Sequence, residues 1–359
     1  LATALFDKPA FNNVIVSGIV MAEDGKKMSK RLKNYTAPDA LMDAYGADAL
    51  RLYLINSGLV KAEEQRFADH GVKDMVRRTL LPWLNSFKFL QTYAEIDGWK
   101  VDTHHATSTH ILDRWILSRL HSLLALIEQH MQHYKLYLVV PELLRFIDDL
   151  TNTYIRLNRG RFWAEGLAED KCQAYTTLFT VVNTFSTCMA PFTPFLAETI
   201  YRDLLAFYQD PNKAAESVHL CDYPQADTQL HDHDLEAGVT RLQQILLLGR
   251  QQRNELKIKI KTPLSSLTVI HKDPTMLNEI RKLESIIKAE LNIKTLEYTQ
   301  DEDRYITLFA KPNSPVLGKR LQQRFGPFRQ HIQNLSHADI LQLEEQGELI
   351  IDDERFTPE

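Results

Sequence analysis

The sequence is poor in cysteine and lacks any long apolar run. Its 359 residues include three cysteines, Cys172, Cys188 and Cys221, which lie far apart and form no Cys-x-x-Cys pair. We expect them to be reduced, partly buried thiols of a cytoplasmic protein, with no zinc site. No apolar run reaches the length of about 18 residues that a membrane span requires, and no cleavable signal is present. Neither a membrane span nor secretion is therefore predicted.

An excess of charge of either sign is also missing. The formal net charge is −5, so any contact with nucleic acid must come from a local basic patch rather than from the whole surface. The apolar content of 44% and the charged content of 25% are ordinary for a globular protein. The length predicts two or three domains.

Residues 13–57 contain a strand, loop and helix pattern around a lysine-rich turn. β-forming residues fill positions 14–21, and the turn at 26–31 follows Gly25. Apolar residues at spacings of three and four then predict a helix across 41–53. We expect the lysines on a loop between a buried strand and a helix, where α/β sheets usually hold ligand-binding residues.

This turn resembles a known signature. Four consecutive residues of the turn spell Lys-Met-Ser-Lys, namely Lys27, Met28, Ser29 and Lys30. They resemble the Lys-Met-Ser-Lys-Ser signature of class I aminoacyl-tRNA synthetases. The flanking residues 24–26 and 32–35 are similar to those of the isoleucyl enzymes, especially the eukaryote-like branch, and 46–53 fits the isoleucyl, valyl and leucyl group. Arg31 departs from the signature, since serine is common at the fifth position.

The resemblance implies that the turn assists the activation of isoleucine by ATP with Mg²⁺. The amino-acid carboxylate, already an anion, attacks the α-phosphate and expels pyrophosphate, so fixed cations rather than a base are required. Lys27 and Lys30 are therefore candidate catalytic residues. The same resemblance implies ATP binding by Lys27, Met28, Ser29 and Lys30. The alternative is a solvated basic turn, which is the usual meaning of an isolated Lys-Lys-x-x-Lys.

Two parts of a complete class I synthetase are missing from the sequence. It contains no His-x-Gly-His element for the ATP phosphates and nothing similar to a large editing domain. We therefore expect a C-terminal portion of a longer enzyme, inactive alone. Selection of isoleucine would lie in the missing half.

The predicted fold is mainly α with smaller α+β parts. Residues 1–58 are expected to form the end of a Rossmann-type catalytic domain with a connecting helix, and residues 59–110 a further helix and linker, kinked or broken at Pro82. Residues 111–235 are expected to form an α-helical anticodon-binding bundle. Residues 236–359 are expected to form a small α+β domain that contacts tRNA.

Apolar stripes at helical spacing predict the bundle. Within it, residues 154–163 and 190–198 resemble the arginine-rich segment and the helix-joining turn of the anticodon-binding domain in this synthetase group. Through that resemblance, three residues become candidates for phosphate contacts along the anticodon stem: Arg156, Arg159 and Arg161. Trp163 is expected in the core. On composition alone, the segment is a solvated basic helix end.

Beyond the bundle, residues 256–264 alternate apolar and basic side chains, which predicts a strand with one basic face. A tRNA-facing surface is one interpretation of the basic residues in this region, which are Arg250, Arg253, Lys257, Lys259, Lys261, Lys319 and Arg320. The other is an edge strand protected against aggregation by lysine. Further strands are predicted over 267–270, 293–298, 305–310 and 349–351, and helices over 276–290, 317–325 and 336–346.

Two histidine clusters, at 231–233 and 104–105, lack further ligands at suitable spacing and are predicted as surface loops rather than metal sites. The resemblance implies tRNA-Ile, ATP and isoleucine as partners, and no membrane. Two alternatives remain open. One is a valyl- or leucyl-tRNA synthetase, and the other is a tRNA-binding module without catalysis.

Overall fold

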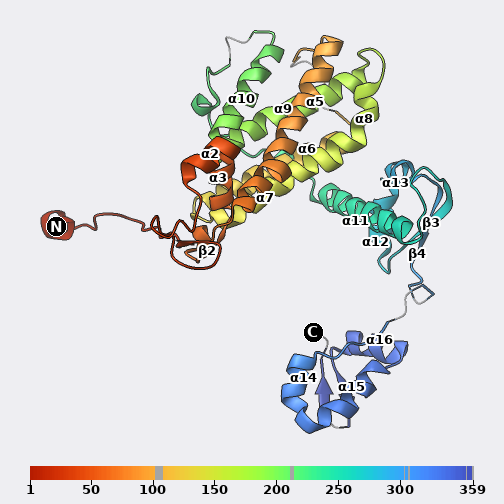
Figure 1. Ribbon diagram of the computed structural model, residues 1–359. Helices are drawn as coiled ribbons and strands as arrows, with labels where there is room; N and C mark the ends of the chain where they lie inside the picture. Colours follow the sequence, from red (N-terminus) through yellow and green to blue (C-terminus); the bar gives the residue numbers. More distant parts are fainter. Residues whose placement is uncertain (102–107, 211–213, 303, 306–307, 353, 358–359) are drawn as a thin grey trace. The chain divides into compact units, whose positions relative to one another are not determined.

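The computed structural model describes residues 1–101, 108–210, 214–302, 304–305, 308–352 and 354–357 (Figure 1). The chain forms two compact units, Leu1–Leu248 and Gly249–Glu359. The described residues are mostly helical, with three two-stranded sheets among them. This confirms the predicted fold class, while the finer domain limits at residues 58, 110 and 235 stay predictions.

The N-terminal segment carries much less strand than predicted. After α1 (Ala2–Phe6), the backbone runs without regular structure to β1 (Val20–Met21), which pairs in parallel with β2 (Gln65–Arg66). The prediction of a buried strand over residues 14–21 is therefore wrong: only the last two residues form a strand, and they are half-buried. Ile15 is 69% exposed, so in this structure the apolar run lacks the second layer that buries such a strand.

The helical pattern after the lysine turn folds as two short helices, α2 (Pro38–Tyr45) and α3 (Ala47–Ile55). Gly46 separates them with φ 84°, a conformation that favours glycine. A short 3₁₀ turn, η1 (Gly58–Lys61), then leads into β2.

Pro82 does not break the next helical run. α4 (Asp69–Met75) continues through a π-helical turn (Val76–Leu80) into α5 (Leu81–Asp97). Pro82 has no N–H to donate, and its ring would clash with an ordinary preceding α-turn. The wider π turn directly before it accommodates both restrictions.

Packed helices form the bundle as predicted (Figure 1). They are α6 (Ile111–Met131), α7 (Leu136–Asp148), a π-helical segment (Asp149–Ile155), α8 (Arg156–Trp163), α9 (Glu169–Met189) and α10 (Pro194–Leu204). Short 3₁₀ turns follow at Leu205–Phe207, Val218–Leu220 and Thr228–Leu230. Aromatic side chains fill the core: the ring of Phe185 lies 5.6 Å from that of Trp83 and 4.9 Å from that of Phe146. All three are 0% exposed, which makes this layer a main source of bundle stability.

Helix α3 is fastened to the turn before α10 by two charged side chains. Asp48, 7% exposed, accepts hydrogen bonds from the backbone N–H groups of Phe195 (3.4 Å) and Leu196 (2.7 Å). Arg51 donates to the backbone oxygen atoms of Pro191 (3.1 Å) and Phe192 (3.4 Å). Burial raises the pKa of Asp48, against the lowering effect of the two N–H groups. The carboxylate thus meets the otherwise unpaired N–H groups at the start of α10.

In the second unit, α11 (His233–Glu255), which begins in the first unit, is followed by β3 (Leu264–Ile270), α12 (Pro274–Arg281), α13 (Glu284–Leu291) and β4 (Ile293–Thr299). β3 and β4 pair in parallel. The strand predicted over 256–264 is wrong, because residues 256–263 form turns and Lys257 has φ 56°. The backbone oxygen atoms of Lys259 and Thr262 accept hydrogen bonds from Arg253 (3.0 and 3.1 Å) instead of from a neighbouring strand.

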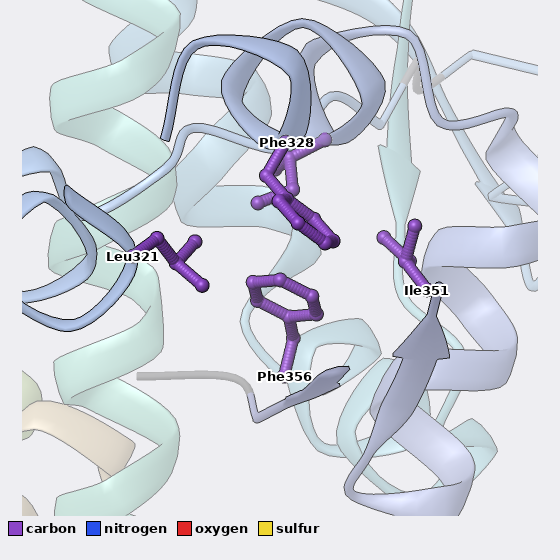
Figure 2. Packing of buried hydrophobic residues seen from close by; sticks show 5 residues of the cluster. Leu321, Phe328, Ile351 and Phe356 are labelled. Atoms are coloured by element: carbon purple, nitrogen blue, oxygen red, sulfur yellow. The ribbon is translucent and has the colours of Figure 1, made fainter. Parts of the chain in front are cut away.

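The last segment contains α14 (Ser314–Leu321), a 3₁₀ turn (Gln322–Arg324), α15 (Phe325–Gln333), α16 (His337–Gln346), β5 (Leu349–Ile351) and β6 (Glu354–Phe356). The side chains of Leu321, Phe328, Ile351 and Phe356 converge in a small core (Figure 2). Ser336 and Asp339 form a capping box, which confirms the predicted start of the helix over 336–346. The strand predicted over 305–310 falls partly outside the described residues, and 308–310 carry no strand.

Candidate functional site

The lysine turn lies between β1 and α2 and reverses the chain tightly. Met21 and Lys27 form an antiparallel bridge, and the N–H of Ala22 donates to the backbone oxygen of Lys26 at 2.8 Å. Gly25 adopts φ 78°, and a Cβ added there would lie 3.2 Å from Nε of Arg66. The positive φ favours glycine at the tip, and a larger residue would also displace the Arg66 side chain, so the turn is a defined structure and not a loose basic loop.

The amide of Asn34 braces this turn from inside. Its Oδ1 accepts a hydrogen bond from the N–H of Ser29 (2.9 Å), and its Nδ2 donates to the backbone oxygen of Lys27 (3.2 Å). The N–H of Lys33, a residue with φ 49°, donates to the backbone oxygen of Ser29 at 3.0 Å. One side chain therefore holds the backbone on both sides of Met28. The sequence gives no signal for this role of Asn34 beyond its place in the family-like stretch 32–35.

Met28 anchors the turn on its apolar side. Its half-buried side chain lines a cavity of about 270 Å³. The other lining residues are mostly apolar and come from β1, α2, α3 and their flanks: Val20, Tyr35, Thr36, Pro38, Leu41, Leu50, Leu54 and Phe67. This apolar contact of the Met28 side chain fixes the orientation of the turn relative to α2 and α3.

Lys27 and Lys30 are exposed, and within the described part of the chain neither ammonium lies within 4.0 Å of a carboxylate. Their neighbour Lys26 differs, since its Nζ lies 3.5 Å from Oδ2 of Asp24. The turn thus presents two positive charges without a salt-bridge partner on a braced backbone. Their assignment to ATP and catalysis stays a prediction.

Arg161 has a structural role that the sequence did not reveal. Its Nη1 and Nη2 lie 2.8 and 3.0 Å from the two carboxylate oxygens of Asp113, which is 0% exposed. Its Nε and Nη2 also donate to Asp170, at 2.9 and 2.7 Å. These bonds lower the pKa of Asp170. With its donors consumed by the buried Asp113 and the exposed Asp170, Arg161 is withdrawn as a phosphate contact.

The Asp113 carboxylate is the centre of this buried network. It also accepts hydrogen bonds from the hydroxyl groups of Tyr154 (2.7 Å) and Ser108 (2.6 Å). Burial, followed by the nearby Asp113 charge, raises the pKa of Tyr154 well above its usual value. The network joins α6 to the π-helical segment and to α8, so it fixes the helix that carries the other arginines.

The remaining residues of the arginine-rich segment are exposed on α8. Arg156 and Arg159 are both exposed. Trp163, predicted in the core, is 56% exposed, and the core position belongs to Phe162 at 0%. The prediction for Trp163 is wrong because the core-facing side of α8 here carries Phe162, packed against Phe89 and Tyr175, while Trp163 lies about 100° away around the helix on the exposed side.

In the second unit, Arg253 is 4% exposed and binds backbone oxygen atoms. Besides Lys259 and Thr262, it donates to the oxygens of Leu291 (2.6 Å) and Asn292 (3.2 Å). It is therefore also withdrawn as a tRNA contact. Arg250 pairs with Glu290 at 2.6 Å but remains partly exposed, and Lys257 is exposed.

The histidine clusters provide no candidate metal centre in the described chain, where no group of three or more possible metal ligands occurs. Within the cluster at 231–233, Asp232 forms an ion pair with Arg114 (2.7 Å). The other cluster, His104 and His105, lies outside the described residues. Among the helices of the described residues, none combines the length and the hydropathy of a membrane span.

Comparison with known proteins gives two family matches and a set of close relatives. Residues 1–66 match the tRNA synthetases class I (I, L, M and V), and residues 113–269 match the anticodon-binding domain of tRNA ligase. The chain is 44% identical over 357 residues to an isoleucine–tRNA ligase of Bdellovibrio bacteriovorus, covering 99% of the chain and 34% of the relative. It is 42% identical to the cytoplasmic isoleucine–tRNA ligases of Mus musculus and Saccharomyces cerevisiae, covering 98% and 97% of the chain and 29% and 34% of the relatives. The chain thus spans about a third of the length of the relatives it matches.

We predict that Asn34→Ala loosens the lysine turn without unfolding the chain. The loss of two hydrogen bonds, at about 1 kcal/mol each, should raise the population of the locally opened turn by roughly tenfold or more. Hydrogen–deuterium exchange of peptides covering residues 26–34 measures this effect. Asn12→Ala, at an exposed position outside the turn, is the control. Unchanged exchange in the Asn34 variant would show that the brace is unnecessary.

We predict unequal stability effects for two arginines of α8. Arg161→Ala leaves the buried Asp113 carboxylate without its cation, which should lower the free energy of unfolding by about 3 kcal/mol. Arg159→Ala, on the exposed face, should change it by less than about 0.5 kcal/mol. Urea unfolding of both variants tests this. Equal effects would contradict the structural role of Arg161.

Proposed function

The chain belongs to the isoleucine–tRNA ligase family of class I tRNA synthetases, and on that premise we propose that it takes part in the ATP-dependent activation of isoleucine and its transfer to tRNA-Ile. The lysine turn would contribute to the first step, and the helical bundle would bind the tRNA. This division follows the two family matches, one over each of these regions. The cytoplasm is the proposed location, since the mouse and yeast relatives are cytoplasmic isoleucine–tRNA ligases.

In activation, Lys27 and Lys30 would stabilise the negative charge that develops on pyrophosphate as it leaves. The single observation that carries this role is that both ammonium groups are exposed and lack a carboxylate partner among the described residues, while the backbone between them is held in place. A cation already paired with a carboxylate would have to give up that partner in the transition state. An unpaired, positioned cation avoids this reorganisation.

ATP would bind with Mg²⁺ as the substrate, and Met28 and Ser29 belong to the proposed ATP site together with the two lysines. The Met28 side chain faces the apolar cavity, so its backbone is the part available to a nucleotide. Ser29 contributes its backbone N–H to Asn34 and therefore serves to shape the turn. Opening and closing of the turn over ATP would hinge near Gly25, whose φ of 78° is accessible to glycine.

For tRNA, the proposed contacts are Arg156, Arg159, Arg250 and Lys257, all exposed or partly exposed. Phosphate groups of the anticodon stem and its surroundings are the expected ligands, because such contacts need a cation at the surface and no fixed sequence. The identity of 42–44% with isoleucine–tRNA ligases favours the isoleucyl assignment over the valyl and leucyl alternatives. The presence of the lysine turn favours a catalytic protein over a purely tRNA-binding module.

We predict that Lys30→Ala, in the full-length enzyme, lowers the rate of isoleucine-dependent pyrophosphate exchange by roughly a hundredfold, since loss of one group that stabilises the transition-state charge typically has this cost. Its affinity for tRNA should stay the same. Lys26→Ala is the matched control, because that lysine lies in the same turn but already pairs with Asp24. A wild-type exchange rate in the Lys30 variant would refute the assigned role.

We predict that Arg159→Ala weakens tRNA binding at moderate salt and reduces the slope of log affinity against log salt by about 1, as expected for one lost phosphate contact. Pyrophosphate exchange without tRNA should be unaffected. Arg77→Ala is the control. Arg77 lies outside α8, its side chain is 65% exposed, and it pairs with Asp74. An unchanged salt slope in the Arg159 variant would remove this residue from the interface.

A further inference from the structure

Trp163 differs from every other tryptophan of the chain. Trp83, Trp99 and Trp115 are at most 3% exposed, whereas Trp163 is 56% exposed at the end of α8. Within the described residues, its ring contacts no other aromatic ring and no cation. A tryptophan side chain is large and mostly apolar, so leaving it in water gives up a substantial burial energy. A ligand that covers the ring would recover it.

The surface next to Trp163 is open. Side chains on a helix lean back toward residues three and four positions earlier, which here are Gly160 and Arg159. Beyond the helix itself, no heavy atom of the described chain lies within 4 Å of the Cβ position that a side chain at Gly160 would occupy. Glycine inside a helix costs about 1 kcal/mol relative to alanine, so a bare position beside an exposed indole needs a reason.

The platform is also rigid and positively charged. Phe162, directly before Trp163, is buried with its ring 5.1 Å from that of Phe89 and 5.4 Å from that of Tyr175. Arg161 is held by Asp113 and Asp170, so the backbone on which the indole sits is fixed. Arg159 is exposed one helical turn before the indole. An exposed aromatic ring, the open surface at Gly160 and a nearby guanidinium are together suited to bind an unpaired base and its phosphate.

We propose that Trp163 stacks on an unpaired base of the bound tRNA, with Gly160 leaving the space for that base and Arg159 binding the adjoining phosphate. The inference rests on the proposed tRNA-binding function and deepens it by naming the ligand of this surface, a single-stranded nucleotide rather than a duplex. Stacking uses the face that every base has, so this contact supplies affinity and positions the loop, while it selects little among bases.

Binding of tRNA-Ile to the full-length enzyme tests the proposal. Trp163→Ala should lower the affinity by roughly tenfold, whereas Trp163→Phe, which keeps an aromatic face, should retain most of it. Gly160→Leu, which fills the open surface beside Trp163, should lower the affinity to a similar degree. The slope against salt should stay as in the wild type, because no phosphate contact is removed. Phe195→Ala is the matched control, an aromatic residue that is 67% exposed on another helix.

Fluorescence gives a second, independent result. The emission that is present in the wild type and absent from Trp163→Phe should be quenched when tRNA binds, since stacking on a base quenches indole. Wild-type affinity in both the Trp163→Ala and Gly160→Leu variants, with Arg159→Ala still weakening binding, would overturn the stacking proposal and leave the proposed function standing. The stacking proposal would also be overturned if the Trp163→Ala and Gly160→Leu variants lost as much affinity for a fully paired RNA duplex as for tRNA-Ile. Failure of the wild-type enzyme to bind tRNA would overturn both.

Discussion

The two hydrogen bonds of the Asn34 side chain are the interaction on which the candidate site depends. They tie Ser29 and Lys27 together from inside the turn, at 2.9 and 3.2 Å, and leave the side chains of Lys27 and Lys30 outside. Met28 adds an apolar anchor on the opposite side. A basic turn without such a brace would sample many conformations, and its charges would be poorly positioned for a transition state. The brace thus fixes the backbone that carries the two exposed lysines.

Charged residues elsewhere in the chain divide by what their donors and acceptors already bind. Arg161 binds the carboxylates of Asp113 and Asp170 and holds its helix in place. Arg253 binds backbone oxygen atoms and holds the following turns in place. Asp48 and Arg51 fasten α3, which follows the lysine turn, to the start of α10 in the bundle. Arg159 lies on an exposed face beside Trp163. Buried ionic groups thus fix the scaffold, and the proposed RNA contacts are among the exposed ones.

The sequence predicted what depends on helical periodicity and failed where tertiary partners decide. The bundle follows from apolar residues such as Phe146 and Phe185, because burial of one helix face needs no long-range information. The strand expected at 14–21 shrinks to two residues, since its pairing partner in the described chain is only β2. Residues 256–264 alternate like a strand, yet Arg253 binds their backbone oxygens. The exposure of Trp163 and the burial of Arg161 likewise depend on neighbours distant in sequence, such as Asp113, and periodicity does not identify them.

The central claim is that Lys27 and Lys30 meet the phosphates of ATP, and chemical protection measures it most directly. The full-length enzyme is treated with a lysine-acetylating reagent with and without saturating ATP and Mg²⁺, and modification of each lysine is followed by mass spectrometry. The account predicts that ATP slows acetylation of Lys27 and Lys30 by severalfold, while exposed Lys26, paired with Asp24, reacts at nearly the same rate in both conditions. Equal rates for Lys27 and Lys30 with and without ATP would contradict it.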